Sequence, residues 1–112
     1  MRLNVNSIFY YESREGRTPF IEWLESLKDR DARAKIKVRI DRVRLGNFGE
    51  HRSVQDGVWE LIVDYGPGYR VYYGKIGMNV VLLLCAGTKK RQQKDIEIAK
   101  EFWQDYRKRN NA

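Results

Sequence analysis

Hydrophobic and polar positions in the first half of the chain predict one strand and two helices. A run of β-forming residues over 7–12 predicts the strand. Thr18 and Pro19 suit a helix start, and the apolar residues that follow at helical spacing are Phe20, Trp23, Leu24 and Leu27. A second helix is predicted from about Asp31 to Gly46, with an apolar stripe formed by Ala32, Ile36, Ile40 and Val43.

The second half predicts a β-meander and a final helix. Polar residues 47–56 predict a loop. Strands are predicted over 58–64, 69–75 and 79–85, and the last is nearly all apolar, as in a strand covered on both faces. A helix from about Gln92 to Lys108 carries Ile96, Ala99, Trp103 and Tyr106 on one side. The order β-α-α-β-β-β-α predicts a single α+β domain over residues 1–112, with helices packed on a mainly antiparallel sheet.

The charge balance indicates contact with polyanions. The 112 residues include 22 Lys and Arg against 15 Asp and Glu, which gives a formal net charge of +7. A chain of this charge is attracted to nucleic acid, because neutralising phosphates releases condensed counterions. The alternative is that the positive charge only keeps the protein soluble.

Several other classes of protein are excluded by the composition. A single cysteine, Cys85, rules out an intramolecular disulfide, and its apolar surroundings predict a buried, inert thiol. One Cys and one His do not supply the spacings of a zinc site, and we expect neither a metal nor a cofactor. The longest apolar run, 80–86, is too short to span a bilayer, and the N-terminus does not read as a signal peptide. We therefore expect a soluble cytoplasmic protein without membrane contact.

Arg70 is the first candidate functional residue. It lies in the middle of a predicted strand, where a charged side chain is costly unless it is paired or exposed. Glu60, on the neighbouring strand of the hairpin, is a plausible partner, and the pair could be an ordinary cross-strand salt bridge. The functional alternative, which we favour, is a guanidinium that a rigid sheet holds toward a phosphate.

A run of three cations at the start of the last helix is the second candidate. Lys89, Lys90 and Arg91 directly follow the third strand of the meander. Free amides at a helix N-terminus suit anions, but cations there oppose the helix dipole. A run that works against local stability favours a functional role, although an ordinary solvated charge run is the alternative.

Specific motifs resemble the HigB-like "addiction module killer" branch of the RelE/ParE toxin superfamily. The resemblance covers nearly the whole chain and is most specific in the block DYGPGYRVYY, residues 64–73. It continues through LLLCAG at residues 82–87, then Lys89, Gln92, Lys94 and Asp95, and into the last helix.

This resemblance implies a RelE-like fold and a toxin that a cognate antitoxin, expected to be a helix-turn-helix protein, holds inactive. It also implies that the toxin cleaves mRNA on the ribosome. The family's strand arginine corresponds to Arg70 and its basic residue after the last strand to Lys89. The chain departs from the family pattern at Ile62, where relatives often carry Arg, and at Thr88-Lys89-Lys90, where they often read Asp-Lys-Ser.

A metal-independent endoribonuclease would use the RNA 2′-hydroxyl as its nucleophile. Arg70 would then hold the scissile phosphate, and Lys89 or Lys90 would act as the base if neighbouring cations lowered its pKa. The acid would be the other lysine, Lys94 or Tyr72.

Further residues are predicted to contact RNA. His51 is either a proton donor and acceptor or a solvated loop residue, and Arg52 beside it suits a phosphate. Arg91 and Lys94 extend the basic run, while Asp95 suits the first turn of its helix and could orient a lysine. The basic side of the second helix is expected to dock on ribosomal RNA or meet an acidic antitoxin, chiefly through Lys35, Arg39 and Arg42. The tryptophans at positions 23, 59 and 103 are expected in the core.

Two other functions remain open at this point. ParE-like members of the superfamily inhibit DNA gyrase without cutting, and Ile62 in place of a cation favours that reading. A third possibility is a module that binds nucleic acid without catalysis, for example operator DNA together with the antitoxin. It predicts steeply salt-dependent binding and no cleavage.

Overall fold

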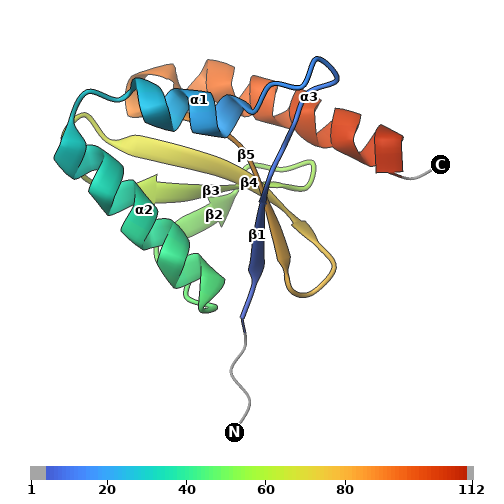
Figure 1. Ribbon diagram of the computed structural model, residues 1–112, viewed down its shortest axis with the longest axis horizontal. Coiled ribbons are helices and arrows are strands. Elements are labelled where there is room, and N and C mark those ends of the chain that lie inside the picture. The colour runs from blue at the N-terminus through green and yellow to red at the C-terminus, as the bar shows by residue number, and fades with distance from the viewer. Residues whose placement is uncertain (1–4, 111–112) are drawn as a thin grey trace, which may run out of the picture.

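The computed structural model describes residues 5–110 and arranges them as a five-stranded sheet with helices on both faces (Figure 1). The strands lie in the order β1-β5-β4-β3-β2. Strand β1 (Ser7–Tyr10) pairs in parallel with β5 (Val80–Thr88), and the other neighbours, β4 (Tyr69–Ile76), β3 (Val58–Val63) and β2 (His51–Ser53), are antiparallel. The predicted α+β class and mainly antiparallel sheet are therefore confirmed.

The first two helices cover one face of the sheet. Helix α1 (Pro19–Ser26) begins with proline in its first turn, as predicted. Helix α2 (Arg30–Arg44) is capped by Asp29, whose side chain accepts from the amides of Asp31 and Ala32. Their buried residues form one core with the sheet: Phe20, Leu24, Ala32, Ile36, Ile40 and Val43 pack with Leu61, Val71, Tyr73 and Leu83, among others.

Helix α3 (Gln92–Asn110) covers the opposite face. A 3-10 turn, η1 (Lys89–Arg91), connects it to β5. Trp103 and Ala99 are buried against Val58, Tyr72 and Leu84. Of the other tryptophans, Trp23 and Trp59 are half-buried at the edge of the first core rather than enclosed.

The largest differences from the predicted strands concern β2 and β5, while β1 ends at Tyr10 and is two residues shorter than predicted. The predicted loop 47–56 contains the strand β2, so the observed order has one strand more than predicted. This three-residue strand is fully exposed and is held by pairing His51–Ser53 with Trp59–Leu61, which no hydrophobic pattern signals. Strand β5 runs to Thr88 instead of Cys85, because β4 continues to pair with it through Tyr69.

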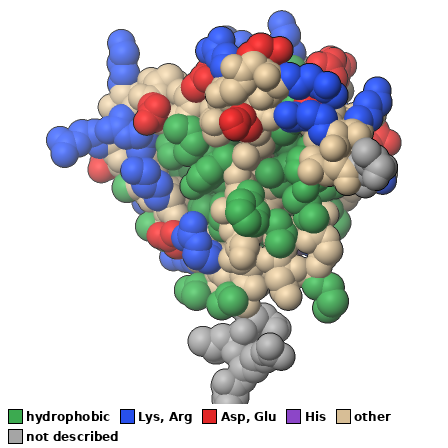
Figure 2. All heavy atoms as spheres, turned by 45° about the vertical axis from the view of Figure 1, so that its right-hand side comes forward, with side chains coloured by type: hydrophobic (Ala, Val, Ile, Leu, Met, Phe, Trp, Pro, Cys, Tyr) green, Lys and Arg blue, Asp and Glu red, His purple; other side chains and the backbone are tan. Residues whose placement is uncertain are grey.

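Near the free edge of β1, apolar side chains remain at the surface (Figure 2). Phe9 is 55% exposed, and it lines a groove of about 510 Å³ with Ile76, Val80 and Tyr106. In the part of the chain that is described, no helix is long and apolar enough to cross a membrane.

Candidate functional site

Three charged side chains project from neighbouring strands onto the α3 face of the sheet. Arg52 on β2 pairs directly with Glu60 on β3, and Arg70 on β4 lies one register step away, opposite Ile62. Because side chains two positions apart share a face of a strand, Glu60 and Ile62 lie on the same side. Gly87 on β5 pairs with Arg70 and has no side chain of its own on this face.

Glu60 is the anionic centre of this group. Its side chain is fully buried, and its Oε1 accepts from Arg52 Nε at 2.6 Å. Gln92, the first residue of α3, donates Nε2 to both carboxylate oxygens at 3.0 and 3.2 Å. Arg70 Nε lies 4.0 Å from Oε1, so the predicted Glu60–Arg70 pair is confirmed, although Arg52 is the closer partner. A buried carboxylate is thus satisfied by hydrogen bonds from both sides.

The guanidinium of Arg70 is left with free donors. Its side chain is 11% exposed, its Nη1 donates to the Tyr69 carbonyl at 3.1 Å, and its buried Nε has no hydrogen-bond partner among the described residues. An arginine has five N–H donors, so most of them are available. Its side chain opens into a pocket of about 330 Å³ that it shares with Lys89, Glu50, Asp64 and the turn 66–68.

Gly68 brings Lys89 close to Arg70. The Lys89 amide donates to the Gly68 carbonyl at 2.9 Å, which fixes η1 against the β3–β4 turn. Gly68 has φ +81°, and a Cβ there would lie 3.3 Å from Lys89 Cβ and 3.7 Å from Arg70 Nη1. Glycine is therefore required at this position both by the backbone and by the pocket.

The other cations of the predicted run lie outside this pocket. Lys90, Arg91 and Lys94 are exposed on η1 and the first turn of α3, and none of them lines the pocket. Arg91 Nε lies 3.8 Å from Asp95 Oδ1. Of the two lysines proposed as the base, only Lys89 is brought together with Arg70.

The carboxylate of Asp95 is buried, which its position in the first turn of a helix did not predict. Its side chain is 10% exposed, and its Oδ2 is buried with no hydrogen-bond partner among the described residues. Burial raises the pKa of this carboxyl, and the charges of Arg91 and Lys94 partly oppose that shift. The oxygen lies where a side chain on Gly87 would be, since a Cβ there would come within 1.9 Å of it. Nothing in the sequence pattern signalled this contact.

Tyr72 does not fit the role of acid. Its side chain is fully buried beneath α3, out of reach of an RNA. Burial, together with the charges of Glu60 and Asp95, raises the pKa of its hydroxyl far above the usual range. That prediction is wrong.

Some of the predicted RNA-binding residues lie elsewhere. His51 points to the opposite face from Arg52, because the two are adjacent on a strand, and it packs between the rings of Phe48 and Trp59. Arg39 donates to the backbone carbonyls of Ile62, Phe48 and Glu50, so its guanidinium anchors the chain before β2. Neither side chain joins Arg70.

Other predictions about reactive groups can be assessed directly. Cys85 is buried and burial raises the pKa of its thiol strongly, which confirms an inert cysteine. Within residues 5–110, no three His, Cys, Asp or Glu side chains gather as metal ligands do. The charged residues that line the Arg70 pocket are two cations, Arg70 and Lys89, and two carboxylates, Glu50 and Asp64.

The chain is similar in sequence to a bacterial protein. The chain is 49% identical over 86 residues to a protein of Haemophilus influenzae (strain KW20 / Rd) that is described only as uncharacterized. The match covers 77% of this chain and 87% of that protein. No protein-family model matches the chain.

Proposed function

We propose that this chain, which belongs to the same family as the Haemophilus influenzae protein, is the toxin of a toxin–antitoxin pair and cleaves mRNA on the ribosome. The sequence resemblance to RelE/HigB-like toxins motivates this proposal. The observation that carries it is the Arg70 side chain, which is held on a strand, lines a pocket together with Lys89 and makes one hydrogen bond, to the Tyr69 carbonyl, among the described residues. A preorganised cation of this kind suits the charge that develops on a phosphate during cleavage.

The proposed reaction needs no group from outside the protein and the RNA. The RNA 2′-oxygen attacks the adjacent phosphorus while its proton passes to a base, and the bond to the 5′-oxygen breaks as that oxygen receives a proton. The products are a 2′,3′-cyclic phosphate and a free 5′-hydroxyl. Arg70 stabilises the phosphate oxygens. A carboxylate that lines the pocket, Glu50 or Asp64, accepts the 2′-hydroxyl proton, and the Lys89 ammonium donates the proton that the 5′-oxygen takes up.

Glu60 acts in this proposal as a positioning residue. Its carboxylate holds Arg52 and Gln92 directly and lies 4.0 Å from Arg70. It therefore sets the orientation of two cations without being exposed itself. Replacing Glu60 with Gln keeps the shape of the side chain but removes the charge that orients them.

The test is induced expression in a bacterial host with mapping of mRNA 5′ ends. Wild type should arrest growth and produce new cuts inside translated frames. Arg70→Ala should abolish both, whereas Arg107→Ala, which removes an exposed cation from the far end of α3, should behave as wild type. Cuts that persist undiminished in the Arg70→Ala variant would overturn the proposed site.

One observation favours a second function. Ile62, which pairs opposite Arg70 and lines the same pocket, stands where a cation is common in the RNA-cleaving relatives. Loss of that cation favours a ParE-like inhibitor of DNA gyrase. Growth arrest with no new mRNA cuts, together with inhibition of DNA supercoiling by the purified protein, would support this alternative.

A further inference from the structure

A second hollow adjoins the Arg70 pocket. It has a volume of about 360 Å³ and lies between α2 and the end of β3, lined by Lys35, Val38, Arg39, Arg42, Val63, Asp64 and Tyr65, among others. Asp64 lines both this groove and the Arg70 pocket. Asp64 therefore forms part of the wall of both hollows, directly after the end of β3.

The walls of this α2–β3 groove combine free cations with an aromatic ring. Lys35 and Arg42 are exposed, and within residues 5–110 neither forms an ion pair. Lys35 Nζ lies 5.1 Å from the centre of the half-buried Tyr65 ring. Val38, 46% exposed, adds an apolar surface beside them. Phosphates bind to mobile cations of this kind, and bases stack on such rings.

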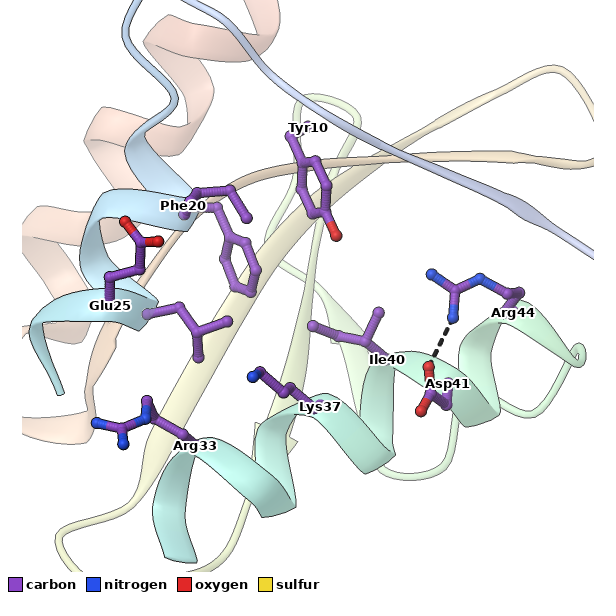
Figure 3. Close-up of a pocket in the computed structure, with 10 residues that line it drawn as sticks. Tyr10, Phe20, Glu25, Arg33, Lys37, Ile40, Asp41 and Arg44 are labelled. Carbon is purple, nitrogen blue, oxygen red and sulfur yellow. Dashed lines mark hydrogen bonds and ion pairs between the residues drawn. The ribbon is translucent and has the colours of Figure 1, made fainter. Parts of the chain in front are cut away.

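The opposite side of α2 presents cations in a different setting (Figure 3). Arg33, Lys37 and Arg44 line a groove of about 660 Å³ between β1, α1 and α2. There Arg44 is paired with Asp41 at 2.6 Å, and Arg33 donates to the Leu27 carbonyl. This groove shares no lining residue with the Arg70 pocket. Helix α2 thus carries two basic sides, only one of which adjoins the candidate site.

We propose that the α2–β3 groove binds the segment of single-stranded RNA next to the scissile phosphate. One phosphate of that segment contacts Lys35 and Arg42, and a base stacks on Tyr65 after Lys35 moves from the ring to the phosphate. The aromatic ring favours an unpaired strand, because the bases of a duplex are already stacked on one another. The proposal rests on the proposed function, since it extends the path of the RNA from the same pocket.

Replacing Asp64 should change the affinity for RNA in the opposite direction from replacing a cation. Its exposed carboxylate lines both hollows, so an RNA strand that runs from one to the other must approach a negative charge. Neutralising that charge should strengthen binding, whereas removing a cation from the groove should weaken it. If RNA bound only through the net charge of the protein, its affinity would depend far less on where in the protein a charge is removed.

The experiment measures binding of a fluorescent 2′-O-methyl oligoribonucleotide at several salt concentrations. This probe cannot be cleaved, because its 2′-oxygen is blocked. The double variant Lys35→Ala/Arg42→Ala should lower the slope of log K against log salt by roughly 0.7, since each phosphate of a single strand that is no longer neutralised contributes about 0.7. Tyr65→Ala should weaken binding roughly tenfold, and Tyr65→Phe, which keeps the ring, should not. Asp64→Asn should bind more tightly than wild type.

The control is the double variant Lys37→Ala/Arg44→Ala, which removes the same charge from the other side of the same helix. Its slope should stay close to that of wild type. Equal losses in the two double variants, or no binding of the probe to wild type at low salt, would overturn the proposal. So would equal competition by polyglutamate of the same charge, because it would identify a site for acidic protein instead.

Failure of the cleavage proposal gives a different result. If the probe binds through Lys35, Arg42 and Tyr65 but no mRNA is cut in cells, the groove assignment stands and the nuclease proposal fails. If Arg70-dependent cuts appear while the groove variants bind and cut as wild type does, only the groove assignment fails. Thermal unfolding of each variant, compared with wild type, shows whether a loss of binding comes from a loss of fold.

Discussion

Gly87→Ala tests directly whether Asp95 packs onto the strand beside Arg70. A Cβ on Gly87 would lie 1.9 Å from Asp95 Oδ2 and 3.0 Å from Asp95 Cγ, and both atoms belong to a buried side chain. No atoms can remain at that separation, so either α3 or the carboxylate must move. Because Gly87 is paired with Arg70, the displacement occurs next to the candidate site.

The size of the effect follows from the contact. Forcing an extra methyl group into a packed region costs typically about 1–3 kcal/mol of unfolding free energy. In an Asp95→Ala background the clashing atoms are gone, and the substitution should then be close to neutral or favourable by about 0.5–1 kcal/mol, because Ala is less costly than Gly within a strand. The two substitutions should therefore show a coupling energy of about 1–4 kcal/mol, the difference between these two effects.

Urea denaturation of wild type, both single variants and the double variant measures this coupling. The unfolding slopes should agree among the four proteins, so that midpoints can be compared as free energies. Additive effects of the two substitutions would show that the Asp95 side chain does not occupy the space above Gly87. A destabilised Gly87→Ala variant that Asp95→Ala fails to rescue would refute the contact in the same way.

Three further predictions concern stability. Arg39→Lys should cost about 1–3 kcal/mol in denaturant unfolding, because a lysine cannot reach the carbonyls of Ile62, Phe48 and Glu50 together; an unchanged midpoint would contradict the anchoring role. Gly74→Ala should lower the melting temperature by several degrees, since its Cβ would lie 2.3–2.7 Å from three atoms of the Trp103 ring, and wild-type melting would show that this packing is wrong. For Asp95 the folded pKa is raised, so the folded state holds the proton more tightly than the unfolded chain. The stability this gives is complete below the ordinary Asp pKa of about 3.9 and is lost as pH rises through the raised folded value. Asp95→Asn should remove that loss, and identical pH profiles of unfolding for the two proteins would contradict it.

Much of the fold follows from patterns that the sequence displays. The apolar stripes of α1, α2 and α3 are the faces that pack on the sheet, and Gly46 ends α2 with φ +93°. Strand β2 could not be predicted, because its residues are held by backbone pairing and bury no side chain. The extension of β5 to Thr88 likewise depends on the length of its partner β4, which is a property of the pair and not of either segment.

The candidate site could be predicted only in part. A charged residue in the middle of a strand indicated Arg70, and the hairpin indicated Glu60 as its partner. Two other assignments depended on which way a side chain points. His51 falls on the far face through strand alternation once β2 is known, and Arg39 is occupied by carbonyls that lie far from it in sequence. A long side chain with several donors can bind either the protein's own carbonyls or a ligand, and its place in the sequence pattern does not distinguish the two.

The division of hydrogen bonds around Glu60 explains why Arg70 is suited to an anion. Glu60 accepts its shortest hydrogen bond from Arg52, which is largely exposed. It accepts two more from the amide of Gln92, which carries no charge. Arg70 stands at 4.0 Å, within the attraction of the carboxylate but without a hydrogen bond from its Nε. Glu60 therefore lowers the cost of placing a second cation in the sheet while leaving that cation incompletely satisfied. Arg70 also lines the pocket, where a phosphate would accept from its remaining guanidinium donors. An arginine that costs stability in the free protein is therefore the residue that favours binding of an anion.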